Sequence, residues 1–201
     1  MIRRSRIVSA EYRYNCGFPE VFALRGSKLL KISLFLIAGM VLLLLILTGI
    51  GATLPETHQA SRTLHLSQSP EAVWEVITNR PEEPSWRNDV TSMERLPDRN
   101  GNQVWREVYR SGDSVVLETI ESQPPGRLVR RIADDEGPFS GTWTYTVRGT
   151  DGGSTVNIEE NGRVPNPFFR FVSKYVIGHE LFLDTYLKAL ARKFGDEPRI
   201  T

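Results

Sequence analysis

Aromatic residues recur at alternate positions in two segments in a way that suits a binding pocket. Trp105 alternates with Glu107 and Tyr109, and Trp143 precedes Tyr145 by two residues. Because alternate residues of a strand point to the same face of a sheet, each set is predicted to share one face. Large rings with a polar tip suit a pocket for an amphipathic molecule. Ordinary core packing is an equally good interpretation.

Charged residues on the predicted strands are the next candidates for chemistry. Glu118 and Arg130 lie in segments rich in apolar residues. A charge on the covered face of a sheet is costly without a partner, so it would mark ligand recognition or a buried ion pair. Arg130 and Glu118 are the leading candidates for such a role. We expect most other strand charges to lie on the solvated face of the sheet.

His179 is the histidine best placed for acid–base chemistry. It shares a predicted helical stripe with Tyr175, Phe182 and Tyr186. If that stripe faces a cavity, the imidazole is able to bond a ligand carbonyl or to transfer a proton. The alternative is a half-buried histidine bonded to a side chain of the sheet.

Motifs for nucleophilic catalysis, zinc hydrolysis and phosphate binding do not occur in the sequence. The three histidines, His58, His65 and His179, are too widely spaced to indicate a metal site. The sequence therefore predicts no catalytic residue, no metal and no cofactor.

A phenylalanine-rich segment, residues 165–171, follows the last predicted strand. Its three phenylalanines, Phe168, Phe169 and Phe171, are more than one buried helix face requires. One interpretation is that this segment gates a cavity mouth or dips into a membrane interface. The alternative is a helix start that docks on the edge of the sheet.

The charge is distributed unevenly along the chain. The 201 residues hold 25 Lys+Arg and 24 Asp+Glu, but residues 1–31 hold seven basic and two acidic residues. The remainder is mildly acidic, which argues against a nucleic-acid partner.

A 19-residue uncharged run, residues 32–50, follows the basic leader. As a helix it spans about 28 Å, close to the ~30 Å core of a bilayer. The basic residues precede the run, so the positive-inside rule predicts a cytoplasmic N-terminus and a domain on the exterior or periplasmic side. A cleaved signal peptide is the competing interpretation, although its apolar region is usually about 7–15 residues long.

The rest of the chain predicts an α+β domain with one antiparallel sheet. Ser69-Pro70-Glu71-Ala72 has the pattern of a helix start, with a Ser N-cap and Pro in the first turn. A second short helical turn is expected at Pro84-Ser85-Trp86, and a long amphipathic helix at residues 168–194. Strands bounded by Gly, Pro, Asn or Asp are expected at residues 61–67, 90–96, 103–110, 114–122, 127–134, 139–148 and 154–164.

Three segments in this order resemble the START/Bet v 1-like superfamily, also called SRPBCC or polyketide cyclase/dehydrase-like. They are the helix start from Ser69 to Ile77, the tryptophan turn from Pro84 to Val90, and Gly141-Thr142-Trp143-Thr144-Tyr145. The resemblance covers residues 61–194. It implies a helix-grip fold, in which a curved sheet of about seven strands wraps around a long C-terminal helix.

The resemblance also implies a hydrophobic or amphipathic small molecule bound between sheet and helix. We expect the chain to bind or transfer a lipid-like or polyketide-like molecule while held in a membrane. The alternatives are a cyclase- or hydrolase-type enzyme that uses His179 and Glu118, and an envelope interaction module without catalysis. The expected lining residues are Trp86, Trp105, Tyr109, Glu118, Arg130, Trp143, Tyr145, Phe168, Val172, Tyr175, His179 and Phe182.

The predicted organisation has five parts. They are a leader (1–31), a transmembrane helix (32–54), a linker (55–60), the SRPBCC domain (61–196) and a tail (197–201). The sequence predicts no oligomeric state.

Overall fold

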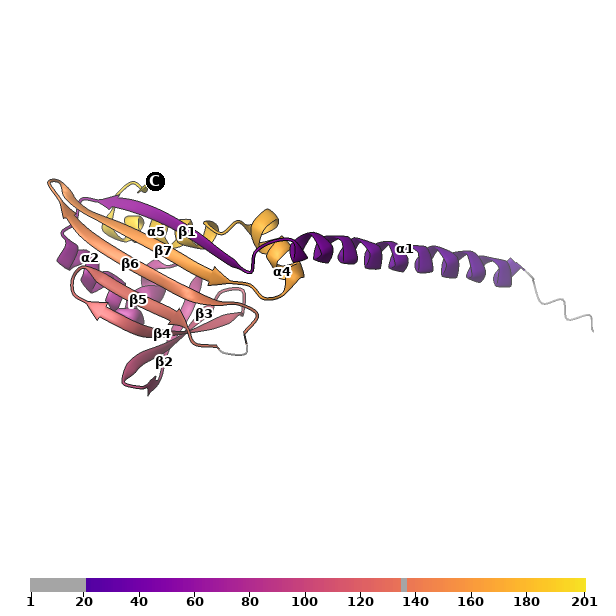
Figure 1. The fold of residues 1–201 in the computed structure, drawn as a ribbon, viewed down its shortest axis with the longest axis horizontal. Helices are drawn as coiled ribbons and strands as arrows, with labels where there is room; N and C mark the ends of the chain where they lie inside the picture. The colour runs from indigo at the N-terminus through magenta and orange to yellow at the C-terminus, as the bar shows by residue number, and fades with distance from the viewer. Residues whose placement is uncertain (1–20, 135–136) are drawn as a thin grey trace, which may run out of the picture. The chain divides into compact units, whose positions relative to one another are not determined.

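A computed structural model describes residues 21–134 and 137–201, with side chains from residue 28 onward (Figure 1). Contacts divide the chain into two compact units, residues 1–43 and 44–201. Most of the basic leader lies outside the described residues. The first described element is the helix α1 (Val21–Ala52), which begins before the predicted span and contains it up to Ala52.

One eight-stranded antiparallel sheet forms the body of the second unit, in the order β2-β3-β4-β5-β6-β7-β1-β8 (Figure 1). The strands are β1 (Thr57–Leu66), β2 (Val90–Arg99), β3 (Asn102–Tyr109), β4 (Ser114–Gln123), β5 (Arg127–Ile132), β6 (Ser140–Thr150), β7 (Gly153–Arg163) and β8 (Arg199–Ile200). The predicted antiparallel sheet is confirmed. Two boundaries differ, because β1 begins inside the expected linker and the expected tail contributes β8, which pairs with β1 through Leu64 and Ile200.

The short helices follow the predicted start signals. The hydroxyl of Ser69 accepts a hydrogen bond from the Ala72 N–H at the start of α2 (Pro70–Thr78). A single turn, η1 (Arg80–Glu82), then leads into α3 (Glu83–Trp86). Pro81 and Pro84 occupy the first turns of η1 and α3, where a missing N–H costs no helix hydrogen bond.

The C-terminal helix differs from the prediction, because it is not continuous over residues 168–194. It consists of α4 (Pro167–Val172), a π-turn η2 (Ser173–Ile177) and α5 (Leu181–Phe194). The Gly178 N–H donates to the Ser173 carbonyl at 2.9 Å, and Gly178 has φ +78°, which ends the helical path. The apolar periodicity continues across this break, so periodicity did not reveal it.

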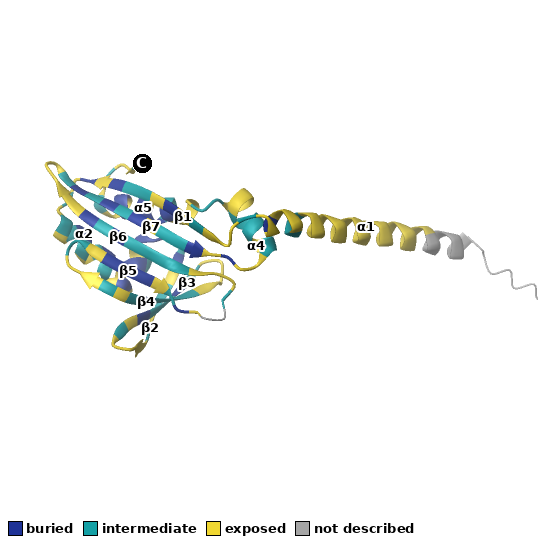
Figure 2. Cartoon of the chain, viewed as in Figure 1, coloured by how far each residue is buried: buried dark blue, intermediate teal, exposed yellow. Residues whose placement is uncertain are grey.

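The core lies between α5, α2 and the concave face of the sheet (Figure 2). Leu183, Leu187 and Leu190 of α5 are completely buried against strand residues such as Leu64 and Ile158. Each such side chain contributes about 1.5–3 kcal/mol through the area removed from water. The middle of the helix-grip interior is therefore packed with protein side chains.

Candidate functional site

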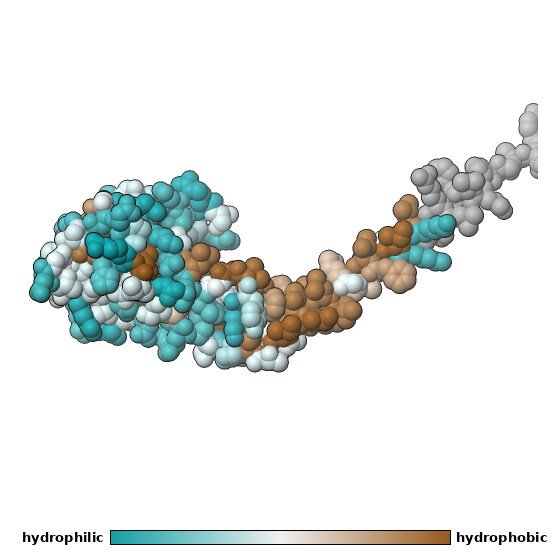
Figure 3. Space-filling model, turned by 90° about the horizontal axis from the view of Figure 1, so that it is seen from above, coloured by the Kyte–Doolittle hydropathy of each residue, from teal (hydrophilic) through white to brown (hydrophobic). Residues whose placement is uncertain are grey.

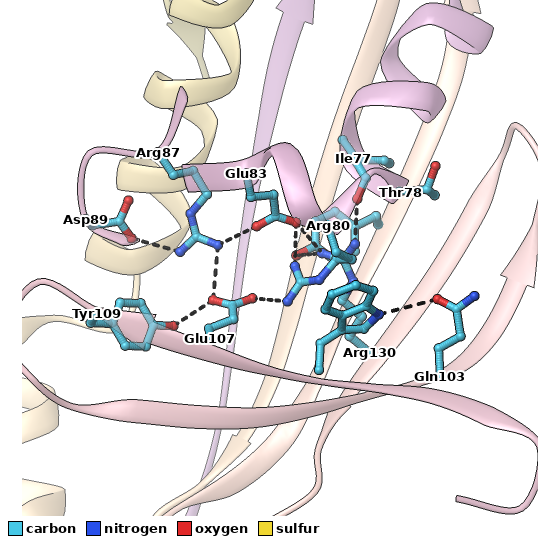
Figure 4. A network of polar contacts seen from close by, with 12 residues as sticks. Ile77, Thr78, Arg80, Glu83, Arg87, Asp89, Gln103, Glu107, Tyr109 and Arg130 are labelled. Carbon is cyan, nitrogen blue, oxygen red and sulfur yellow. Dashed lines mark hydrogen bonds and ion pairs between the residues drawn. The ribbon is translucent and has the colours of Figure 1, made fainter. Parts of the chain in front are cut away.

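A cluster of buried charges lies where η1 and α3 meet strands β3 and β5 (Figure 4). We call Arg80, Glu83, Arg87, Glu107 and Arg130 the buried charge cluster. Each of these five residues exposes 5% or less of its surface. Charged groups are rarely fully buried, so this cluster is a candidate functional site.

Glu107 is the centre of this cluster. One carboxylate oxygen of Glu107 accepts from Arg80 at 2.5 Å, and the other accepts from Arg87 at 3.1 Å and from the Tyr109 hydroxyl at 3.0 Å. Burial would raise the pKa of Glu107, but Arg80 and Arg87 outweigh it and lower the pKa to about 2. Glu107 is therefore ionised at neutral pH.

Glu83 joins the same arginines from the helical side. Its two oxygens accept from Arg80 at 2.5 Å and from Arg87 at 2.8 Å. Burial alone would lower the pKa of both arginines, but Glu83 and Glu107 more than compensate and raise it above the usual value. Both guanidinium groups therefore remain charged.

Arg130 has weaker partners than the other two arginines. It donates to the Ile77 carbonyl at 2.5 Å and to the Tyr145 hydroxyl at 3.3 Å, and it lies 3.6 Å from a Glu83 oxygen. Its Nε atom is buried and has no hydrogen-bond partner. The cluster thus holds three guanidinium groups against two carboxylates, with Asp89 pairing with Arg87 at the partly exposed edge.

An aromatic cluster lies beside the charges. Tyr186 of α5 makes edge contacts with Trp86, Trp143 and Tyr145, with ring centroids 5.5–6.1 Å apart. The Tyr186 hydroxyl is buried without a hydrogen-bond partner, and the Arg87 guanidinium lies over its ring. Burial raises the pKa of Tyr186 well above its ordinary value, so the phenol is neutral.

A hollow of about 350 Å³ reaches this region from the side of α2. Trp74 and Thr78 of α2, Leu128 of β5 and the two cluster residues Arg80 and Arg130 line it. The turn before β3 and residues 119–122 of β4 complete the wall. The wall of the hollow is more polar than apolar, and it includes the carboxylate residue Glu121 as well as the cluster residues Arg80 and Arg130.

The structure brings some of the predicted lining residues together and separates others. Trp86, Tyr109, Arg130, Trp143 and Tyr145 all contact the charge cluster or its aromatic neighbours. Trp105 shares the concave face with Glu107 but is partly exposed, with Arg95 over its ring. The cluster residues Arg80, Glu83 and Arg87 were missed, although their spacing of three and four residues places them on one helical face.

Glu118 and Arg130 do not form a pair. Glu118 accepts from Asn102 at 2.7 Å and from Arg131 at 2.7 Å, which lower its pKa. Arg130 and Arg131 are adjacent in β5 and so point to opposite faces of the sheet. The pairing expected from sequence is wrong because a β-bulge between Thr119 and Glu121 and the strand register could not be read from residue types.

The remaining candidates gather at the break in the C-terminal helix, away from Glu118. The His179 ring stacks on His58 with centroids 3.8 Å apart, and its Nδ1 lies 3.2 Å from the Ser173 hydroxyl. His58 in turn lies 3.2 Å from a Glu160 oxygen. Phe168 packs against the Phe169 ring, Val172 is half-buried, and Tyr175 and Phe182 are exposed.

Replacing Glu107 with Gln is expected to destabilise the domain strongly. The change leaves three buried guanidinium groups facing one carboxylate, which costs about 3–5 kcal/mol of unfolding free energy. Glu94→Gln is the matched control, since Glu94 pairs with Arg106 on the surface at 2.9 Å and its loss costs less than about 1 kcal/mol. Denaturant titration of both full-length variants in one detergent measures the difference, and equal losses would contradict the central role of Glu107.

Protonation of His179 is expected to destabilise the helix break at acid pH. Partial burial, His58 and Lys174 lower the pKa of His179 against the opposing effect of Glu180. The imidazole of His179 therefore binds a proton more readily in the unfolded chain than in the folded chain. The contribution of the neutral imidazole to folding stability is complete above about pH 6.5, and it is lost as the pH falls below that value. His179→Phe keeps a flat ring, and its melting temperature should fall less than that of the unchanged chain between pH 7.5 and 5.5. An identical fall in the melting temperature of both proteins would exclude His179 as the source of the acid sensitivity.

Comparison with known proteins agrees with this architecture. Residues 57–195 match the family model described as polyketide cyclase / dehydrase and lipid transport. A search of curated proteins found no match.

Solved structures share the fold at low sequence identity. A START superfamily protein from Mycobacterium smegmatis aligns with a TM-score of 0.53 at 16% identity, over 68% of this chain and 97% of its own. The Zhui aromatase/cyclase from Streptomyces sp. R1128 aligns with a TM-score of 0.55 at 12% identity. The alignment covers 68% of this chain and 93% of the aromatase/cyclase chain. The family model covers well over half of the sequence, and the chain therefore belongs to the polyketide cyclase/dehydrase and lipid transport family, with the START-like helix-grip fold.

Proposed function

We propose that this protein is a membrane-anchored binding protein for an amphipathic small molecule with an anionic or hydrogen-bond-accepting head. The head would lie against Arg80 and Arg130 in the hollow beside α2, and the apolar part would lie along Trp74 and Leu128. The observation that carries this proposal is the buried Arg130 at the wall of the hollow, with its Nε unpaired.

The size and chemistry of the hollow support a small-molecule ligand. A volume of about 350 Å³ is at the lower end of the range for ligand pockets, which are typically about 300–1,000 Å³. Two guanidinium groups favour a carboxylate, a phosphate or a polarised carbonyl, because they donate several hydrogen bonds in fixed directions. Asp89 balances the third guanidinium group of the cluster through Arg87, so the preference for an anionic head rests on Arg80 and Arg130 at the wall of the hollow.

The family also supports this proposal. Its description includes lipid transport, and the superfamily resemblance implies an apolar or amphipathic ligand. The packed interior beneath α5 directs the ligand in this chain toward the hollow beside α2.

The helix α1 supports the membrane anchor. Its residues Lys28–Ala52 form a 25-residue apolar stretch, by composition and length able to cross a bilayer (Figure 3). A helix of this length extends about 38 Å, more than the ~30 Å hydrocarbon core. The basic leader favours a cytoplasmic N-terminus and a domain on the other side.

Binding of paired fluorescent probes tests the proposed head-group recognition. A fatty acid carrying an anthroyloxy fluorophore should bind the detergent-solubilised full chain more tightly than the same probe ending in an alcohol. Arg130→Gln should weaken binding of the carboxylate probe about 10- to 100-fold, as expected for loss of a charged hydrogen bond. Trp74→Ala should weaken binding of both probes.

Arg131→Gln is the matched control, because Arg131 is adjacent in β5, half-exposed and bonded to Glu118 on the opposite face. Circular dichroism establishes that each variant is folded. Equal affinity for the two probes, or equal effects of Arg130→Gln and Arg131→Gln, would count against the proposed site.

A further inference from the structure

Exposed apolar side chains are concentrated in one short segment of the domain. Among the described residues after α1, the large hydrophobic side chains exposed by 40% or more number eight, and six of them lie between residues 169 and 182. The six are Phe169, Tyr175, Val176, Ile177, Leu181 and Phe182. We call residues 167–182 the apolar corner. A soluble domain seldom leaves so many large apolar side chains together in water.

The apolar corner arises from the break in the C-terminal helix. The π-turn and Gly178 redirect the chain, so that Tyr175, Val176 and Ile177 do not join the α5 stripe that packs on the sheet. Arg62 of β1 forms ion pairs with Glu180 and with Asp184, which fix the start of α5. The exposed rings and aliphatic side chains are therefore held outward by an ordered backbone.

Contacts within the second unit join the apolar corner to the end of α1. Gly51 is buried, and a Cβ atom at this position would come within 1.8 Å of the Pro167 carbonyl oxygen. Arg170 donates to the Leu54 carbonyl at 2.7 Å and to the Pro165 carbonyl at 3.0 Å. The corner is thus packed directly on the last turn of the apolar helix and on the residues that follow it.

The composition of the corner fits a lipid surface. Tyr favours the headgroup level of a bilayer, where its ring meets both apolar and polar groups, and Phe and Leu are common on the buried face of interfacial segments. Lys174 lies over the Tyr175 ring at 5.5 Å, so a cation accompanies the apolar side chains as at other interfacial segments. Within residues 167–182, the charges are Arg170, Lys174 and Glu180, a net of one positive charge.

We propose that the apolar corner inserts its exposed side chains into the headgroup region of the same bilayer that α1 crosses. This inference rests on the proposed membrane anchor. The end of the span is the point at which the chain leaves the hydrocarbon core, and the corner is packed against that point. A lipid surface is therefore available to the corner at every moment, without a search for a soluble partner.

Lipid-dependent quenching at a single labelled residue tests the proposal. Cys16 is the only cysteine, so Cys16→Ser combined with Val176→Cys gives one site for an NBD fluorophore. The full chain is reconstituted in vesicles of phosphatidylcholine and phosphatidylglycerol, with and without lipids spin-labelled at the headgroup or near the top of the acyl chain. The label at residue 176 should be quenched several-fold more than a control label.

Asp151→Cys provides the control label, because Asp151 is exposed in the turn between β6 and β7. The opposite ends of these strands, Ser140 and Arg163, lie near residue 56, where Arg163 pairs with Glu56. Eleven strand residues separate the two ends by about 35 Å, so the control label should remain unquenched. Leu181→Asp with Phe182→Asp should reduce the quenching at residue 176 at least two-fold, and both side chains are already exposed.

The outcomes separate this inference from the anchor. Release of the chain from vesicles by alkaline carbonate would overturn both proposals. A chain that resists carbonate but has equal quenching at residues 176 and 151 would overturn the docking of the corner alone. An NBD label at residue 176 that is shielded from water but is not quenched by the spin-labelled lipid would indicate a protein partner. That result would also overturn the proposed insertion of the apolar corner into the bilayer.

Discussion

The ion pairs of Glu107 with Arg80 and Arg87 are the constraint on which the interior depends. They join the turn η1 and the helix α3 to strand β3, and Arg130 adds strand β5 through Glu83 and the Ile77 carbonyl. Two carboxylates that lost water must each be compensated by guanidinium groups at short distance. The loop between α2 and β2 is therefore fixed by charge as well as by apolar packing.

Under the proposed function, this arrangement would have a consequence for ligand binding. A well-packed apolar core is often as stable or more stable, so a buried charge cluster is a costly device for stability alone. It holds Arg80 and Arg130 rigidly beside a hollow, where a ligand head group would find them already oriented. Rigid placement lowers the entropy lost on binding, and it also favours discrimination between an anionic and a neutral head.

The break in the C-terminal helix has a different role in the fold. The part that follows Gly178, α5, supplies the residues that bury the concave face of the sheet. The part that precedes it, α4 and η2, packs on Gly51 and leaves apolar side chains exposed. The C-terminal helical segment therefore has two parts: α5 closes the core, and α4 with η2 presents an apolar surface beside the end of α1. The stacked His58 and His179 rings lie at this division, where protonation of His179 would bear on its stability.

The sequence by itself determined most of the elements and their order, although not the break in the C-terminal helix or the strand β8. The uncharged run of α1, the Ser69 cap, the strand boundaries set by Gly, Pro, Asn and Asp, and the family all follow from local patterns. The face shared by Glu107 and Tyr109 was also predictable, because strand alternation has a period of two. Only the tertiary structure decided which charges meet. Strand register and the β-bulge paired Glu118 with Arg131 on the opposite face of the sheet, where Glu118 is buried, and left Arg130 beside Glu83. The break in the C-terminal helix at Gly178 leaves Tyr175 and Phe182 exposed and not in the cavity that they were expected to line. These outcomes depend on contacts between segments far apart in the chain, and no local pattern of residue types encodes them.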